Sequence, residues 1–344
     1  MMDAKDRFRN LKEVFEPQIL ALANKVVESA CPNGQTLHHL FSYHMSTGGK
    51  RLRALLPLLV GDALGTDPAF LIPFGAACEV LHNATLVHDD LQDGDRYRRG
   101  RETVWYRFGI PQAINLGDAM FYYTVLLAQK VDVPTELREA VTQRVLLQTL
   151  RVIDGQEREF QLKKKETPIL EDYFLMVEGK TSGLFALPMA GAAQLCGAPA
   201  GLVCGLEDAA RHMGVLFQIQ DDVLDLYADK GRDMRGSDIA EGKRSALVVH
   251  ALETCGSEDR KWLRHILDKQ REETSAEDVK EVIALFARTG SLQNALAEIV
   301  QRRKRALNVK ALEDYPRLKE LVCGMCDLFL EPIRPMMAKE SVEA

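Results

Sequence analysis

Two clusters of aspartate, each spaced for one face of a helix, restrict what this chain can fold into. The first reads Asp-Asp-Leu-Gln-Asp at residues 89–93, and the second reads Asp-Asp-Val-Leu-Asp at residues 221–225. Residues four apart lie on the same face of a helix, so the first and last aspartates of each cluster point together. Like charges at this spacing destabilise an isolated helix unless a cation offsets their repulsion. The clusters therefore predict two helices that meet a cation.

Magnesium is the cation that such clusters suit. Mg²⁺ commonly takes one or two carboxylates together with substrate phosphate oxygens, and it keeps several waters. The two clusters predict a magnesium-diphosphate site with carboxylates on opposite walls. A solvated helix face is the alternative for either cluster alone. The presence of two copies, both flanked by apolar residues, disfavours that alternative.

Basic residues near the first cluster predict a second anion site without metal. Four arginines lie between residues 96 and 101, and the sequence Gly-Gly-Lys-Arg-Leu-Arg occupies residues 48–53. Glycines allow the backbone to approach a ligand closely, and the arginine fork matches phosphate oxygens. Two other basic runs, at residues 163–165 and 302–305, are interpreted as solvated helix faces.

The order of these motifs resembles that of the trans-isoprenyl diphosphate synthases, and in particular the geranylgeranyl and farnesyl diphosphate synthases. The resemblance runs from about Gly48 to Lys243. Besides the clusters already described, it rests on His82, Arg98-Arg99-Gly100, Gly179-Lys180-Thr181 and Phe217-Gln218. Five motifs in this order are far more specific than a single Asp-Asp-x-x-Asp.

The resemblance implies a prenyltransferase. Such an enzyme condenses isopentenyl diphosphate with an allylic diphosphate, head to tail and in trans, to a short- or medium-chain prenyl diphosphate. Two other classes stay open from the sequence. A class I terpene cyclase would use the same ionised diphosphate but would not need the second anion site. A non-catalytic subunit of a heteromeric synthase would be expected to lose acidic residues.

The resemblance also assigns roles to individual residues. About three Mg²⁺ ions are bound by Asp89, Asp93 and Asp221, with Asp90, Asp222 and Asp225 as further ligands or supporting partners. The allylic diphosphate meets Arg98, Lys180 and Lys243. Isopentenyl diphosphate meets Lys50, Arg53, His82 and Arg99. Thr181 and Gln218 face the cationic part of the substrate, and a further loop cation comes from Lys230, Arg232 or Arg235.

Helical periodicity runs almost from end to end and predicts an all-α fold. No composition break divides the chain, so we expect one large domain over residues 1–344, with further helices at 257–335. By resemblance it is a helical bundle of the isoprenoid synthase type around a central cavity. A hydrophobic content of 46% suits a sizeable core.

Residues 181–206 carry no charge and are long enough for a membrane helix. Gly197-Ala198-Pro199 interrupts the run near its middle, so two buried helices are expected and no transmembrane segment.

The net charge of −6 argues against a nucleic-acid partner. Seven scattered cysteines and the absence of a secretory segment indicate a reducing cytoplasm. Cys323 and Cys326 are interpreted as one turn of a helix, and the resemblance implies a homodimer.

Product length is predicted from residue size. By the same resemblance, the growing prenyl chain occupies a tunnel beside the helix of the first cluster. Ala84 and Thr85, shortly before that cluster, are small and would leave this tunnel open at their position. The aromatic run at residues 121–123 would form its floor by bulk. This favours a C20 product, geranylgeranyl diphosphate, with farnesyl and longer polyprenyl diphosphates as alternatives. Core packing away from the tunnel is the other interpretation of the three rings.

Overall fold

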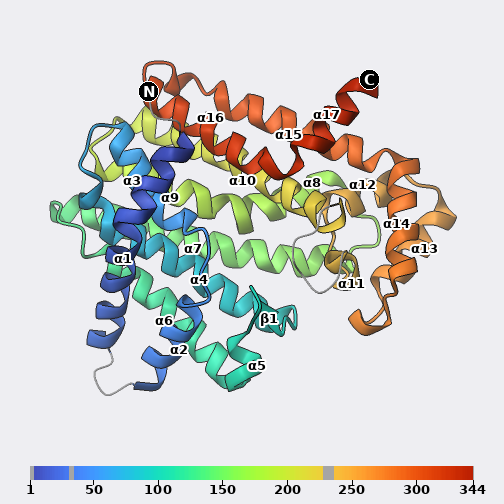
Figure 1. The fold of residues 1–344 in the computed structure, drawn as a ribbon, viewed down its shortest axis with the longest axis horizontal. Helices are drawn as coiled ribbons and strands as arrows, with labels where there is room; N and C mark the ends of the chain where they lie inside the picture. The colour runs from blue at the N-terminus through green and yellow to red at the C-terminus, as the bar shows by residue number, and fades with distance from the viewer. Residues whose placement is uncertain (1–3, 31–34, 228–235, 344) are drawn as a thin grey trace. The chain divides into compact units, whose positions relative to one another are not determined.

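The computed structural model describes residues 4–30, 35–227 and 236–343, and its regular structure is almost entirely helical (Figure 1). Strands β1 (Tyr97–Arg98) and β2 (Arg101–Glu102) pair antiparallel in a short hairpin. Arg99 and Gly100 join them with φ angles of 52° and 73°, as a two-residue turn requires. The prediction of an all-α fold is confirmed.

The chain forms two compact units, each built from three separate stretches. Unit 1 contains Met1–Leu150, Leu184–Asp208 and Val309–Gly324, and unit 2 contains Arg151–Gly183, Ala209–Asn308 and Met325–Ala344. The boundary falls inside the helices α7 (Thr135–Lys164), α10 (Ala200–Tyr227) and α16 (Pro316–Leu330). A single domain over the whole chain stays a prediction.

Helix α4 organises unit 1, because α1, α3 and α6 all pack against it. It begins at Ile72 with a proline in its first turn, where the missing amide hydrogen costs nothing. Phe74 and Leu81 on this helix are fully buried. The elements of unit 1 are α1 (Ala4–Ala30), α2 (Gln35–Met45), α3 (Leu52–Ala63), η1 (Pro68–Leu71), α4 (Ile72–Gln92), α5 (Val104–Phe108), α6 (Ile110–Ala128), α9 (Gly183–Leu195) and η4 (Lys310–Leu312), together with the hairpin.

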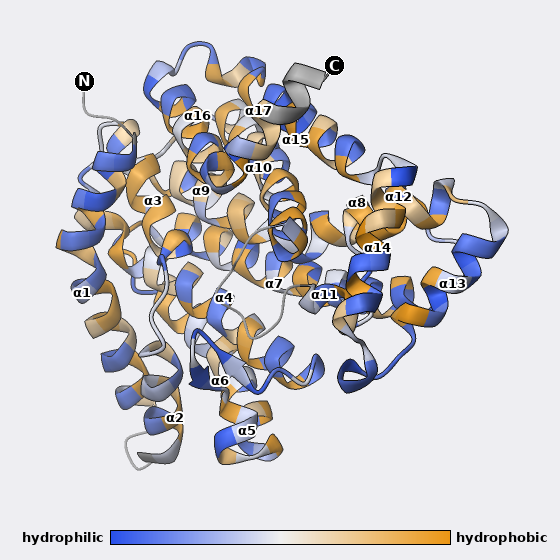
Figure 2. Cartoon of the chain, turned by 45° about the vertical axis from the view of Figure 1, so that its right-hand side comes forward, coloured by the Kyte–Doolittle hydropathy of each residue, from blue (hydrophilic) through white to orange (hydrophobic). Residues whose placement is uncertain are grey.

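Unit 2 packs α12 (Ala246–Thr254) against α8, α14 and α15. Helix α14 begins with a capping box in which Ser275 and Asp278 satisfy each other's backbone amides, and Val282, Leu285 and Phe286 form its buried face. Figure 2 shows hydrophobic and hydrophilic residues alternating along α13. The remaining elements are α8 (Leu170–Val177), the π-helix η2 (Glu178–Ser182), α11 (Ser237–Ala240), α13 (Ser257–Leu267), η3 (Arg271–Glu273), α14 (Ala276–Thr289), α15 (Ser291–Leu307), η5 (Glu331–Ile333) and α17 (Arg334–Glu343).

The uncharged stretch 181–206 divides as predicted. Helix α9 ends at Leu195 and α10 begins at Ala200, and Gly197 turns the chain between them with a φ of 74°. A different segment, Pro68–Gln92, is the one described stretch that is long and apolar enough to cross a membrane by length and composition. Its most apolar window is 72% buried, and core helices pass the same test. The absence of a transmembrane segment stays a prediction.

One residue of the basic run 302–305 departs from the solvated face that we expected, whereas Lys304 and Arg305 are exposed. Arg302 is buried and donates to Glu298 at 2.6 Å, lies 3.6 Å from Glu178, and covers the ring of Phe174. The spacing of the basic run was consistent with an exposed helix face. The sequence did not indicate that Arg302 has an acidic partner, Glu178, on another element. Cys323 and Cys326 lie in α16, which confirms the prediction of a helix turn.

If the two units belong to one cooperative domain, a core defect in either will weaken the whole fold. Phe74 in unit 1 and Phe286 in unit 2 are both fully buried. Replacing either with alanine should lower the free energy of unfolding by about 3–5 kcal/mol. Urea unfolding followed by circular dichroism should give a single transition that both substitutions shift. Two transitions, each sensitive to only one substitution, would show that the units unfold as separate domains.

Candidate functional site

The first acidic cluster lies at the end of α4, in unit 1. Asp89 and Asp93 are half-buried, and the amide of Asp93 donates to the carbonyl of Asp89 at 2.8 Å, which places them one turn apart. Asp90, between them, is only 2% exposed. The cluster therefore consists of two carboxylates near the surface and one inside the protein.

Asp90 is held by an ion pair with Arg98. The Nε of Arg98 donates to Oδ1 of Asp90 at 2.6 Å. Burial raises the pKa of Asp90 to about 7, and the Arg98 guanidinium opposes that rise. Because Arg98 belongs to β1, this pair fastens the hairpin to α4.

The second acidic cluster lies on α10, in unit 2. Asp221 is half-buried, whereas Asp222 is buried. Asp222 accepts hydrogen bonds from the Tyr173 hydroxyl at 2.8 Å, the Ala246 amide at 2.8 Å and the Gln218 side chain at 3.0 Å. Burial raises its pKa to about 6, against the effect of these hydrogen bonds. Asp222 therefore joins α8 and α12 to α10.

Asp225 has a similar supporting role. It accepts from the Ser237 hydroxyl at 2.6 Å with one oxygen and from the Asp238 amide at 3.0 Å with the other. These bonds fix the start of α11. Of the two roles that the sequence left open for Asp90, Asp222 and Asp225, the geometry favours supporting partners over metal ligands.

The remaining aspartates, Asp89, Asp93 and Asp221, suit magnesium. Across residues 4–30, 35–227 and 236–343, no three His, Cys, Asp or Glu side chains gather closely enough to hold a metal ion. Each cluster offers at most two half-buried carboxylates, all hard oxygen donors. That is the donor set of an ion that completes its shell with water and substrate phosphate.

Lys180 and Thr181 lie on the π-helix η2, a form of helix often found at functional sites. Lys180 donates to the buried carboxylate of Glu159 at 2.5 Å, and Thr181 donates to Gln218 at 2.9 Å. Gly155 permits this arrangement, because a Cβ there would lie 2.2 Å from the backbone nitrogen of Lys180. The structure thus gathers the predicted Lys180, Thr181 and Gln218 within unit 2.

Lys243 lies beside α11, 2.7 Å from Glu241 and 3.7 Å from Asp238. Burial raises the pKa of Asp238 to about 8, and Lys243 opposes that rise. The predicted loop cations Lys230, Arg232 and Arg235 lie outside the described residues.

The residues predicted to form the metal-free anion site all lie in unit 1. Lys50 is exposed, while Arg53 is buried with its guanidinium 4.3 Å from the centre of the Phe185 ring. Arg99 donates to the carbonyl of Gly48. Glycine is favoured at position 49, since its φ is 133°, a backbone conformation that other residues rarely adopt. The loop and the hairpin are therefore in direct contact.

His82 lies beside the same arginines. Burial lowers the pKa of His82 well below its ordinary value, and the guanidiniums of Arg53, Arg98 and Arg99 lower it further. His88 lies elsewhere, stacked on Phe121 with ring centres 5.6 Å apart. The two histidines of α4 therefore have different surroundings.

The rings proposed as the tunnel floor have three different environments. Tyr122 is 73% exposed, so its assignment to the floor is wrong. Phe121 is half-buried against His88, and Tyr123 is buried edge-on to Phe41. The error arose because three adjacent residues on a helix cannot share one face. Ala84 and Thr85 are buried in α4.

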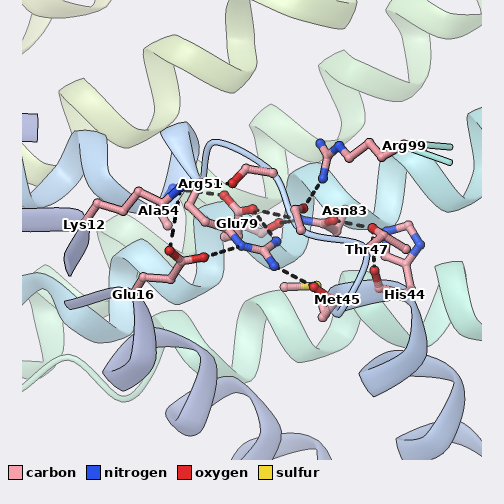
Figure 3. A network of polar contacts seen from close by, with 12 residues as sticks. Lys12, Glu16, His44, Met45, Thr47, Arg51, Ala54, Glu79, Asn83 and Arg99 are labelled. Carbon is pink, nitrogen blue, oxygen red and sulfur yellow. Dashed lines mark hydrogen bonds and ion pairs between the residues drawn. The ribbon is translucent and has the colours of Figure 1, made fainter. Parts of the chain in front are cut away.

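Sequence reasoning gave no role to a buried polar network beside the anion site. Arg51, Glu79, Asn83 and His44 are all buried and bonded to one another in a chain (Figure 3). A buried arginine and glutamate need partners, but their identity depends on which helices meet. The only signal in the sequence was that Arg51 directly follows Lys50 and Asn83 directly follows His82.

Comparison with known proteins identifies the family. Residues 34–286 match the polyprenyl synthetase family. The chain belongs to this family. A short chain isoprenyl diphosphate synthase of Methanothermobacter thermautotrophicus is 30% identical over 334 residues, covering 96% of this chain and 99% of its own. A (2E,6E)-farnesyl diphosphate synthase of Mycobacterium bovis is 32% identical over 249 residues, covering 70% of this chain and 67% of its own.

A solved geranylgeranyl pyrophosphate synthetase from Pyrococcus horikoshii has a similar fold. Its TM-score is 0.79 at 29% identity, and the alignment covers 92% of this chain and 97% of the other. The resemblance drawn from the motifs is confirmed, and with it the class of reaction, the transfer of prenyl groups. The family match includes both acidic clusters and the basic loop.

A buried histidine beside the basic loop makes the stability of this polyprenyl synthetase depend on pH. Burial lowers the pKa of His44 to about 3, and Arg98 contributes to the shift. In the unfolded chain the group titrates near its ordinary value of about 6.5. The folded state thus binds fewer protons, so its stability is complete above pH 6.5 and falls as the pH drops toward 3.

Between pH 7 and pH 5, this histidine should lower the free energy of unfolding of the wild type by about 2 kcal/mol. The His44→Gln variant should not show that part of the decrease. Glutamine keeps a donor for the oxygen of Asn83, which His44 approaches at 3.1 Å. Urea unfolding at both pH values measures the effect. The exposed His39 is the control, and His39→Gln should leave the pH dependence as it is. An unchanged pH dependence in His44→Gln would contradict the assignment of a neutral buried imidazole.

Proposed function

We propose that this chain is a magnesium-dependent trans-prenyltransferase that condenses isopentenyl diphosphate with an allylic diphosphate. The observation that carries the proposal is the presence of two chemically distinct anion sites. Half-buried carboxylates at Asp89, Asp93 and Asp221 suit a metal-bound diphosphate. The basic cluster of Lys50, Arg53, Arg99 and His82 suits a second diphosphate without metal. A protein that handled one diphosphate would not need both.

The metal half of the proposal assigns Mg²⁺ to Asp89, Asp93 and Asp221. When bound, the ions would neutralise the allylic diphosphate and stabilise it as a leaving group. Asp90, Asp222 and Asp225 would hold the surrounding elements in place through the hydrogen bonds described above. Lys180, kept in position by Glu159, would bind the same diphosphate, and Arg98 and Lys243 would join it there.

The basic half assigns isopentenyl diphosphate to Lys50, Arg53, His82 and Arg99. Arginine and lysine offset the phosphate charge without competing for the metal. Thr181 and Gln218 would face the allylic cation with oxygen atoms. Exclusion of water is necessary, because water would otherwise hydrolyse such a cation.

The product we propose is geranylgeranyl diphosphate. Ala84 and Thr85 are buried and small, and side chains of this size would leave room for a growing prenyl chain beside the helix that carries Asp89. The named relatives include both farnesyl and geranylgeranyl synthases, so family membership does not decide the product length. The choice of C20 rests on residue size.

We also propose a cytoplasmic homodimer with no nucleic-acid partner. Four large apolar side chains of α6 are 40–73% exposed and lie four or eight residues apart, at Ile110, Ile114, Tyr122 and Leu126. An apolar stripe of this kind is typical of a surface that another subunit covers. The six described cysteines are free thiols, which suits a reducing compartment.

The metal assignment is tested by removing single carboxylates. Asp89→Ala or Asp221→Ala should lower kcat on the order of 100- to 1,000-fold, because each loses charge stabilisation at the leaving group. Both are half-buried, so the melting temperature should change little. Chelation with EDTA should abolish turnover, and added Mg²⁺ should restore it.

Asp90→Asn is the matched control for these variants. It removes the charge of the carboxylate that lies nearest to Arg98, so it should lower the melting temperature and leave the Mg²⁺ concentration for half-maximal rate near that of the wild type. Near-normal turnover in Asp89→Ala and Asp221→Ala would contradict the magnesium assignment.

Product length is tested by changing bulk on α4 and α6. Ala84→Phe should shorten the product toward C15, with a stability cost of about 1–3 kcal/mol from overpacking. Tyr123→Ala should lengthen it. Tyr122→Ala removes a ring of the same size from the outward face of α6, in the stripe that we assign to the homodimer interface, and should leave the product unchanged. Chromatography of the dephosphorylated products reads out chain length. A longer product from Tyr122→Ala, with none from Tyr123→Ala, would place the tunnel on the other face of α6.

A further inference from the structure

Arg51 faces away from the two basic residues that flank it. Lys50 is exposed and Arg53 contacts Phe185, whereas the side chain of Arg51 is 3% exposed. Its backbone is left-handed, with φ 55° and ψ 33°, a conformation that a non-glycine residue rarely adopts. Such a conformation persists only where the surroundings determine it. The turn at Arg51 separates Lys50 from the start of α3 at Leu52.

The guanidinium of Arg51 makes three contacts that fix this turn. It donates to Glu16 on α1 at 3.1 Å, to Glu79 on α4 at 3.1 Å and to the carbonyl of Met45 on α2 at 2.6 Å. Figure 3 shows Arg51 between the two glutamates. One side chain in the middle of the basic motif therefore joins three helices.

Glu79 connects this arginine to the first turn of α3 and to the rest of α4. One carboxylate oxygen accepts from Arg51 and from Asn83 at 3.1 Å each. The other accepts from the amide of Ala54 at 3.2 Å, one of the amides that a helix N-terminus leaves without a partner. Asn83 in turn lies 3.1 Å from His44. Glu79 is three residues before His82, on the helix that also carries Asp89.

The glycine carbonyls of the loop are held as well. Lys12 donates to the carbonyl of Gly49 at 3.2 Å, and Arg99 donates to that of Gly48. The loop is thus tied to α1 and to the hairpin, in addition to the contacts of Arg51.

Charge makes Glu79 necessary in this place. The guanidiniums of Arg51, Arg53, Arg98 and Arg99 all act on neighbouring groups here. Burial and the guanidiniums of Arg98 and Arg51 lower the pKa of Arg99, and the carboxylates of Glu79 and Asp90 oppose that shift. Without that carboxylate, Arg51 would be a buried cation with only Glu16 to offset it, and the arginines would repel one another.

We propose that Glu79 and Arg51 are positioning residues for the metal-free diphosphate site. They touch no substrate. They hold Lys50 and Arg53 at the ends of a fixed turn and tie that turn to the helix that carries His82. The inference rests on the proposed function, since it takes isopentenyl diphosphate as the occupant of the basic cluster.

The test is the Glu79→Gln variant of the full chain, assayed with both substrates and Mg²⁺. Glutamine keeps an oxygen for the amide of Ala54 but removes the charge that holds Arg51. The KM for isopentenyl diphosphate should rise about tenfold or more, while kcat and the KM for the allylic diphosphate stay within about twofold. Arg51→Lys, which keeps the charge and loses the planar fork, should shift the same constant in the same direction.

Two further variants keep the test decisive. Glu16→Gln changes a half-buried carboxylate on the outer side of Arg51, so it should fold even if Glu79→Gln does not, and it should raise the same KM by a smaller factor. Glu207→Gln is the matched control. It removes a carboxylate that pairs with Arg144 at 2.7 Å on α7, away from the basic loop, and should leave both KM values unchanged.

Equal rises in both KM values, or a fall in kcat alone, would overturn the positioning role. So would an unchanged KM for isopentenyl diphosphate in Glu79→Gln and Glu16→Gln. These outcomes differ from failure of the proposed function, in which the wild-type chain itself would not consume isopentenyl diphosphate. That result would overturn both proposals together.

Discussion

Charges that the fold takes out of water decide how its elements are joined. A carboxylate or guanidinium in the protein interior is tolerated only when an opposite charge or several hydrogen bonds meet it. Asp90 meets Arg98, Glu79 meets Arg51, and Glu159 meets Lys180. Each pair joins two different segments of the chain, which are 8, 28 and 21 residues apart in the sequence. The half-buried groups beside them are thereby held in place without being neutralised.

The difference between buried and half-buried carboxylates explains why the six aspartates of the two clusters have different roles. Asp222 and Asp225 use their oxygens for hydrogen bonds that fasten α8, α11 and α12 to α10. Asp221 stays half-buried beside them. Without the buried supports, the outer carboxylate would have no fixed position from which to bind an ion. We infer that each motif needs adjacent aspartates because, in the proposed function, one would bind the metal ion and the next would hold the surrounding elements in place.

The helices and the faces on which their charged residues lie could be predicted from the sequence, because both depend on local information. Spacing of four placed Asp89 and Asp93 on one face, and Gly197 marked the break between α9 and α10. Partners could not be predicted in the same way. Nothing local connects Asp222 with Tyr173, or Arg302 with Glu178, since these contacts depend on which helices meet. Tyr122 was misassigned for a different reason, because three adjacent residues of a helix cannot all lie on one face.

The central claim is that the chain joins isopentenyl diphosphate to an allylic diphosphate. It is tested most directly by incubating the purified chain with radiolabelled isopentenyl diphosphate, Mg²⁺ and geranyl or farnesyl diphosphate. The account predicts label in a prenyl diphosphate that is longer than the allylic substrate by whole isoprene units, and no product when either substrate is left out. Hydrocarbon or alcohol formed from the allylic diphosphate alone, with the label unused, would contradict it.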